Sequence, residues 1–232
     1  EGERDQGAGI FGRWVWHDAK AEVYGELNYN DAKYNLRDLI LDTGHARAYT
    51  IGIHKVFQKT PTSKIYEFSW ERTLMQQTSS RLLRDASSWY MHSRVRHGYT
   101  NNGEVMGAGI GPGSNSQYFE FSMIDELDKY SIAFEVIDQD NDFFMYAFED
   151  AGDFRRYWKD FNVHFSVQKK IKNYWGRINV VYSRSLNYQW ELDDYTDPYY
   201  HAGTDVNNLH VNFNLTYHFN SKKKYKLNKV YP

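Results

Sequence analysis

The chain of 232 residues contains no cysteine, which excludes disulfides, thiol catalysis and cysteine-bound zinc. It has no apolar run that approaches the ~20 residues of a membrane-spanning helix, and its mean hydropathy is −0.77. Neither positive nor negative charge is in large excess: the net charge is −2, so the sequence lacks the large positive charge that indicates nucleic-acid binding. Only four prolines interrupt the chain. These absences exclude helical membrane proteins and leave room for long strands.

Aromatic residues are abundant at 18% of the chain, and many of them recur at every second position. Residues 209–219 read LHVNFNLTYHF, with an apolar or aromatic side chain at each odd position and a polar one at each even position. Side chains alternate across a strand, so this segment has one apolar and one polar face. Residues 35–41 and 80–85 alone look mildly helical. The same alternation occurs in residues 21–29, 66–71, 119–123, 132–136, 161–168 and 178–189.

Alternation fits a soluble β-sandwich as well as a membrane β-barrel. Three observations favour the barrel. The strands are on the order of 10 residues long, which suits a tilted bilayer crossing. Their polar faces carry Asn, Gln, His and Ser more than the Lys and Glu mixture of soluble surfaces. Aromatic residues gather at strand ends, as in an interfacial girdle: Trp14, Trp16, Trp89, Tyr90, Tyr174, Trp175, Trp190 and Phe219. We therefore predict an all-β, antiparallel transmembrane barrel of the bacterial outer membrane.

The connections can be checked against a topology in which the closing strand, residues 209–219, descends to the periplasm. Short turns then fall inside and long segments outside only if Asn101, Asn102 and Gly103 form a hairpin turn and residues 105–110 an extra strand. The count is about 10–11 strands, within the uncertainty of such reasoning. An odd count would place the first residue outside. We interpret residues 1–219 as the C-terminal portion of a larger barrel, and residues 220–232 as a basic periplasmic tail.

Three segments resemble the capsule assembly Wzi family in its Bacteroidetes version. Residues 96–116 read RHGYTNNGEVMGAGIGPGSNS, residues 21–31 read AEVYGELNYND, and residues 35–52 read NLRDLILDTGHARAYTIG. The resemblance covers most of the chain and is strongest from residue 21 to residue 116. It implies the C-terminal half of an outer-membrane barrel of about eighteen strands. Such a protein binds capsular polysaccharide and retains it at the surface of a Gram-negative cell, without enzymatic activity.

The resemblance also implies the partners. They are capsular polysaccharide, outer-membrane lipid or lipopolysaccharide, and the N-terminal half of the same barrel; other outer-membrane or periplasmic proteins are further candidates. No cofactor is expected. The main alternative is an outer-membrane channel or transport barrel for a small solute, or a component of a larger outer-membrane complex.

The family motif is rich in glycine at alternate positions. Such glycines remove the side chains from one face of a strand and allow another backbone or a ligand to approach closely. The spacing does not fit a nucleotide-binding loop, because no Gly-Lys-Ser/Thr follows. We favour a bend, or chain folded against the lumen, over direct ligand contact. The motif residues assigned this structural role are His97, Gly98, Tyr99, Gly107, Gly109, Gly111, Pro112, Gly113, Ser114 and Asn115.

Sugar binding uses aromatic faces for stacking and amide or carboxylate groups for hydroxyls. Two predicted loops offer both, although an interfacial girdle with solvated loops explains the same residues. The candidate polysaccharide-binding residues are Arg81, Trp89, Tyr90, Asp194, Tyr195, Asp197, Tyr199 and Tyr200.

On the polar face of the strands, His164 and His210 are expected to line the lumen rather than to bind metal. The carboxylate pairs Glu22/Glu26 and Glu67/Glu71 could in principle do acid–base chemistry. Cross-strand pairing with a luminal arginine is the commoner use of such groups. The arginines considered are Arg94, Arg96 and Arg177. No Ser-His-Asp order stands out, so we predict no catalytic residues.

Overall fold

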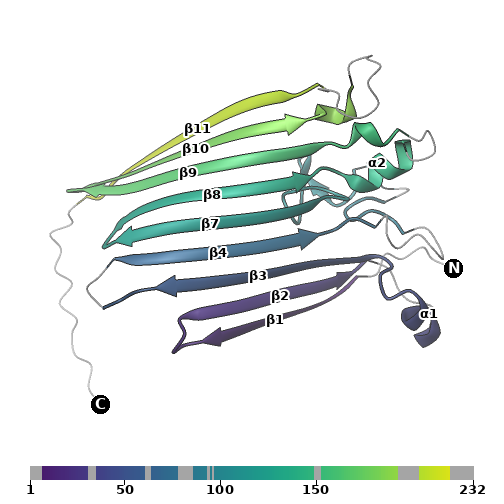
Figure 1. Ribbon diagram of the computed structural model, residues 1–232, viewed down its shortest axis with the longest axis horizontal. Helices are drawn as coiled ribbons and strands as arrows, with labels where there is room; N and C mark the ends of the chain where they lie inside the picture. The colour runs from purple at the N-terminus through teal and green to yellow at the C-terminus, as the bar shows by residue number, and fades with distance from the viewer. Residues whose placement is uncertain are drawn as a thin grey trace.

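The protein is built on one antiparallel sheet, seen here in a computed structural model (Figure 1). The structure describes residues 7–30, 35–60, 64–77, 86–92, 95, 97–148, 153–192 and 204–219. Nine strands pair in the order β1-β2-β3-β4-β7-β8-β9-β10-β11, so each strand lies beside the strands next to it in this series. The all-β prediction is confirmed. None of the described helices is long and apolar enough to cross a bilayer.

Seven of the nine sheet strands, all except β1 and β3, contain all or most of one of the alternating segments quoted above. The sheet strands are β1 (Ala8–Trp16), β2 (Ala21–Tyr29), β3 (Arg47–Phe57), β4 (Ile65–Leu74), β7 (Asn115–Asp125), β8 (Asp128–Asp138), β9 (Lys159–Ile171), β10 (Tyr174–Leu186) and β11 (Val206–Tyr217). The remaining elements are β5 (Thr100–Asn101), β6 (Glu104–Val105), the helices α1 (Leu36–Leu41) and α2 (Asn141–Phe148), and the 3-10 turns η2 (Phe154–Arg156) and η3 (Tyr188–Trp190). The helical tendency of residues 35–41 is thus confirmed, whereas residues 80–85 lie outside the described residues.

The connections divide the sheet into two unlike ends. Turns 17–20, 58–64, 126–127 and 172–173 lie at one end, which we call the short-turn end. The long connections 30–46, 75–114, 139–158 and 187–205 lie at the other, the loop end, which carries α1 and α2 (Figure 1). Short turns and long connections are therefore separated between the two ends as predicted, although without the extra strand that the prediction required. The tail, residues 220–232, lies outside the described part of the chain.

The predicted extra strand at residues 105–110 is wrong. Asn102 and Gly103 do form the expected hairpin turn, with φ of 51° and 84°. However, this turn joins only the two-residue strands β5 and β6, and residues 106–110 belong to no strand. Backbone N–H groups in and next to this stretch bond within the connection instead: that of Ala108 donates to the Tyr90 hydroxyl and that of Gly111 to Ala108 O. The sheet thus has nine strands, and their number remains odd.

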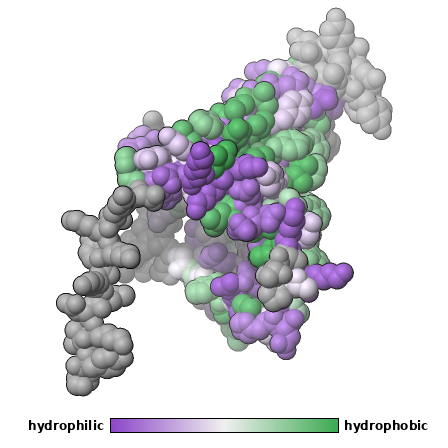
Figure 2. All heavy atoms as spheres, turned by 90° about the vertical axis from the view of Figure 1, so that its left-hand side faces the viewer, coloured by the Kyte–Doolittle hydropathy of each residue, from purple (hydrophilic) through white to green (hydrophobic). Residues whose placement is uncertain are grey.

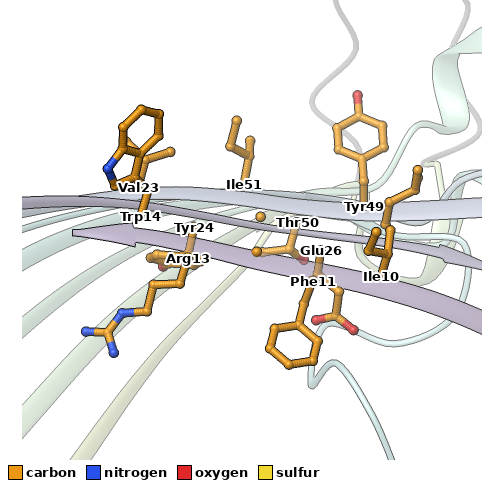
Figure 3. Close-up of a pocket in the computed structure, with 13 residues that line it drawn as sticks. Ile10, Phe11, Arg13, Trp14, Val23, Tyr24, Glu26, Tyr49, Thr50 and Ile51 are labelled. Atoms are coloured by element: carbon orange, nitrogen blue, oxygen red, sulfur yellow. The ribbon is translucent and has the colours of Figure 1, made fainter.

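Strand register gathers the apolar side chains on one face, called here the apolar face. Phe68 lies opposite Phe121 with their ring centroids 5.0 Å apart. Ile178 lies opposite Phe213 in the same way across β10 and β11. Figure 3 shows the separation on β1 to β3, where Trp14, Val23 and Ile51 point to one side and Arg13, Glu26 and Thr50 to the other. The second side is the polar face.

The apolar face is exposed rather than packed against a second layer. Phe213 is 62% exposed and Phe121 52%. In the described ranges, the fully buried residues gather largely at the loop end, where connections fold together. The buried apolar side chains are Ala46, Ala48, Met75, Ala133, Ile137 and Phe144. A sheet this open on its apolar side needs a cover of low polarity, because exposed apolar patches of such extent are unusual on monomers in water.

One glycine on the polar face allows a close contact between strands. A Cβ at Gly52 would collide with the ring of Tyr24, whose hydroxyl donates to Glu71 Oε2 at 2.5 Å. We expect Gly52→Ala to displace this ring and lower the free energy of unfolding by about 1–3 kcal/mol. Gly25→Ala is the matched control, because its Cβ would meet only ordinary contact, 3.5 Å from Thr50 O. Urea titration in detergent micelles measures both variants. Equal stability of the two would contradict this interpretation.

Candidate functional site

Carboxylates on the polar face are joined to neighbours on adjacent strands. Lys129 Nζ lies 3.6 Å from Glu67 Oε2 and 3.5 Å from Glu120 Oε1, so one ammonium group bridges two carboxylates. Ser122 Oγ donates to Glu67 at 3.0 Å, and the Tyr118 hydroxyl donates to Glu120 at 2.7 Å. Each carboxylate therefore has cross-strand partners, as expected for structural groups on a packed polar surface.

The cross-strand partners differ from those predicted. Arg177 Nε donates to the amide oxygen of Gln168 at 3.1 Å rather than to a glutamate. Arg13 Nε donates to Glu22 at 3.0 Å, and this partner was not foreseen. Arg94 and Arg96 lie outside the described residues.

The two histidines lie on the polar face, as predicted. His164 is opposite Val181, and His210 is opposite the same residue from the other side of β10. His164 Nε2 lies 3.4 Å from Glu135 Oε2, which also accepts from Asn162. Within the described ranges, no three histidine or acidic side chains are grouped as they would be to hold a metal ion.

A buried group of amide and carboxylate side chains ties the loop end together. Gln76 Oε1 accepts from Asn115 Nδ2 at 2.5 Å and from Asn141 Nδ2 at 2.7 Å. Gln77 is 2% exposed, and its Nε2 donates to Arg47 O at 2.9 Å. These bonds connect the start of β3, the end of β4, the start of β7 and α2. The loops are therefore fixed relative to the sheet.

Asp142 at the start of α2 extends this group. Its Oδ1 accepts from the backbone N–H of Gln77 at 2.6 Å and its Oδ2 from Ser88 Oγ at 2.7 Å. Gln77 and Ser88 flank residues 78–85, so one carboxylate anchors both sides of this stretch. Its position at the first turn of a helix also favours a negative charge.

The glycine motif is packed against this same region. Gly113 has φ of 60°, and a Cβ there would collide with Asp140 Oδ1 and approach Asp142 Cβ at 2.9 Å. The buried Ser114 accepts from the Asp140 N–H at 3.0 Å. Ser114 Oγ donates to Pro112 O. Asn115 Oδ1 accepts from the Met75 N–H and so caps the end of β4. Gly111 has φ of 86°. Gly109 is open, with no described atom within 4 Å of its Cβ position.

Tyr90 organises the other half of the motif. Its hydroxyl accepts from the Ala108 N–H at 3.0 Å, and its carbonyl accepts from the Tyr99 N–H at 2.8 Å. A Cβ at Gly98, where φ is 58°, would collide with that carbonyl. His97 O accepts from Thr100 Oγ1 at 2.8 Å. One edge of the Tyr90 ring is thus occupied by the chain itself.

The structure describes only two of the eight predicted sugar-binding residues. Trp89 lies beside Tyr90 with ring centroids 6.2 Å apart, and both are half-buried. Arg81, Asp194, Tyr195, Asp197, Tyr199 and Tyr200 lie outside the described residues. The structure therefore brings together one pair of the predicted set.

A larger aromatic cluster forms at the loop end of β8, β9 and β10. The ring centroid of Trp190 lies 4.5 Å from that of Phe143 and 5.0 Å from that of Trp158, which lies 5.2 Å from Tyr188. Phe143 is 42% exposed, and Tyr146 on the same helix is 80% exposed. We call Phe143, Trp158, Tyr188 and Trp190 the aromatic platform. Sequence analysis placed Trp190 only in the girdle and missed the others.

The platform is held in place by polar contacts and by strained backbone. Trp190 O accepts from Arg156 Nη1 at 3.0 Å, and Trp158 Nε1 donates to Asp160 at 2.8 Å. Asn187, Gln189 and Trp190 have φ of 53°, 55° and 59°, a left-handed conformation that costs energy in residues other than glycine. Such strain concentrates at functional sites. The rings of the platform are inclined to one another by 53° to 87°, and guanidinium and carboxylate groups lie beside them.

The charges next to the platform are paired. Asp153 accepts from Arg155 Nε at 2.8 Å and from Arg156 Nε at 3.0 Å. These hydrogen bonds, that from Arg155 first, hold the pKa of the Asp153 carboxyl below its usual range.

Comparisons of the chain with protein-family models, with curated proteins and with solved structures find no match. The similarity to the Wzi family therefore remains a prediction from the motifs quoted above.

Asp140 gives the loop end a dependence on pH. Burial raises the pKa of its carboxyl from 3.8 to about 6; the N–H of Phe143 opposes this and the Asp142 carboxylate adds to it. The folded state thus keeps a proton that the unfolded state has lost, and stability falls as pH rises from about 4 to about 6. Asp140→Asn keeps the acceptor but cannot ionise. We expect it to be more stable than wild type above pH 6 by about 1 kcal/mol, allowing for partial exposure.

Urea unfolding at several pH values measures this difference, which should shrink toward pH 4. Asp153→Asn is the control of opposite sign, because the lowered pKa of Asp153 contributes stability that is present at neutral pH and is lost as pH falls. A gain for Asp140→Asn that is the same at all pH values contradicts the prediction.

Proposed function

We propose that this chain forms part of the wall of a bacterial outer-membrane β-barrel that binds capsular polysaccharide at its loop end and retains it at the cell surface. The observation that carries the proposal is the uninterrupted apolar face, which spans all nine strands and is exposed. A lipid bilayer is the cover that such a face fits, and the polar face opposite it would line the lumen. The loop end then faces outward, as long loops do in bacterial barrels.

Strand length and direction support the same conclusion. Seven of the strands have 10 to 13 residues, which suits tilted crossings. The edge strands β1 and β11 both run from the loop end to the short-turn end, and neither has a second partner among the described strands. Antiparallel closure therefore needs an odd number of further strands between them. The N-terminal half of a larger barrel meets this requirement and brings the total to the usual even number.

The aromatic platform supports polysaccharide as the ligand. Exposed aromatic faces stack against the apolar faces of sugar rings, while neighbouring amide, carboxylate and guanidinium groups bind hydroxyls. The loop end offers both kinds of group within a few ångströms of each other. Among the described residues, hydrogen bonds from Asn115 and Asn141 to Gln76 hold the end of β4, the start of β7 and α2 together, which reduces the order that these residues have to gain on binding.

Membrane insertion is tested by charge on the two faces of one strand. Phe213 lies on the apolar face and Asn212 on the polar face of β11. We expect Phe213→Arg to weaken folding into phosphatidylcholine vesicles by about 2–4 kcal/mol, because the charge would enter lipid, and Asn212→Arg to have little effect. Unfolding of the vesicle-inserted protein in urea measures both. A soluble protein with this fold would show small effects for both variants, and that result would refute the membrane assignment.

Polysaccharide binding is tested with the exposed ring of the platform. We expect Phe143→Ala to weaken binding of purified capsular polysaccharide about fivefold, since one aromatic stacking contact is worth about 1 kcal/mol. Trp175→Ala, at the short-turn end, is the control. Isothermal titration of the detergent-solubilised protein gives the affinity, and capsule released into the medium by cells with Phe143→Ala gives the cellular effect. Ion conductance without polysaccharide binding would favour a channel instead.

A further inference from the structure

Four lysines surround one groove at the short-turn end, between the β1–β2 turn and the β3–β4 turn. The groove is lined by Lys20, Lys55, Lys59 and Lys64 with a single carboxylate, Asp18. Two exposed aromatic side chains, Phe57 and Tyr66, complete the lining of one side. We call this set the lysine groove. It plays no part in the loop-end site described above.

Most of the positive charge in the groove is not neutralised. Lys64 Nζ pairs with Asp125 at 3.3 Å. Lys20 Nζ donates to the neutral amide oxygen of Gln58 at 3.3 Å, and Lys55 Nζ donates to the carbonyl of Ala19. Lys59 has no ion-pair partner among the described residues. In the described part of the chain, Lys20 and Lys55 therefore have only neutral oxygen partners and Lys64 alone is paired with a carboxylate, so the groove can accept an anion.

The groove opens onto the edge of the apolar face. Lys55 and Phe57 lie on this face of β3, opposite Phe68 and Tyr66 of β4. The Lys55 ammonium lies 5.5 Å from the ring centroid of Phe57, so the cation and the exposed ring are side by side. Phe57 is 51% exposed and Tyr66 52%. In Figure 2, which faces the short-turn end, hydrophilic side chains gather beside hydrophobic ones.

We infer that the lysine groove binds the phosphate of an anionic phospholipid headgroup in the membrane leaflet at the short-turn end. The inference rests on the proposed membrane insertion and deepens it. A phospholipid matches both halves of the site, since its phosphate meets the ammonium groups while its acyl chains lie along Phe57 and Tyr66. Free phosphate would use only the lysines. Long lysine side chains at the ends of membrane-spanning segments reach toward headgroups in this way.

The test is lipid binding by the full chain in detergent, measured by native mass spectrometry with phosphatidylglycerol and with phosphatidylcholine. The variant Lys20→Gln, Lys55→Gln, Lys59→Gln removes three charges from the groove. We expect it to lose at least tenfold in affinity for phosphatidylglycerol, since each lysine near a headgroup contributes about fivefold, and to bind phosphatidylcholine as before. Glutamine at position 55 keeps a donor for the Ala19 carbonyl.

The matched control removes three charges at the same end but outside the groove, two in the last residues of β9 and one in the turn that follows: Lys169→Gln, Lys170→Gln, Lys172→Gln. A small effect of this control supports a defined site. Equal losses in the two triple variants would mean diffuse attraction and overturn the inference, as would an unchanged affinity in the groove variant. Displacement of phosphatidylglycerol by an equal concentration of inorganic phosphate would identify a free-phosphate site and also overturn it.

Flotation with pure phosphatidylcholine vesicles separates this inference from the proposed function. If wild type floats but the groove variant binds phosphatidylglycerol normally, membrane insertion stands and the lipid site is refuted. If wild type does not float, membrane insertion and the lipid site fail together. Flotation of the groove variant itself shows that its folding is intact.

Discussion

The pairing register of the nine strands is the constraint on which every other feature depends. Side chains alternate with a period of two, so a slip of one residue in any ladder would move a whole strand's apolar side chains to the polar face. The observed pairs avoid this at every step, from Trp14 opposite Val23 to Ile178 opposite Phe213. One uninterrupted apolar surface results. Its exposure is the observation on which the proposed lipid environment rests.

The same register decides which polar groups can meet. Lys129 reaches both Glu67 and Glu120 because β8, β7 and β4 are neighbours whose polar side chains share a face. Packing on this face comes from such pairs rather than from an apolar core. Most of the fully buried residues lie instead at the loop end, where Gln77, Ser114 and Asn141 fasten the connections. The sheet thus has few internal layers and relies on its ends and its surroundings for cohesion.

Sequence patterns predicted what depends on near neighbours in the chain. Alternation located seven of the nine sheet strands, and the Asn-Gly pair at positions 102 and 103 located a hairpin turn. These local patterns do not predict contacts between segments that are distant in the sequence. Residues 106–110 form no strand, and the Ala108 N–H bonds instead to the Tyr90 hydroxyl, a contact that the sequence around neither residue predicts. The aromatic platform likewise joins Phe143, Trp158 and Trp190, which come from three segments that are separate in the sequence.

The connections, rather than the strands, give the sheet a direction. The meander returns every short turn to one end, so lysines such as Lys20 and Lys59 collect there next to Phe57. Every long connection returns to the other end, where carboxylates, amides and aromatic rings can fold into a binding surface. This difference between the two ends fits the proposed membrane, which has phospholipid on one side and surface glycan on the other.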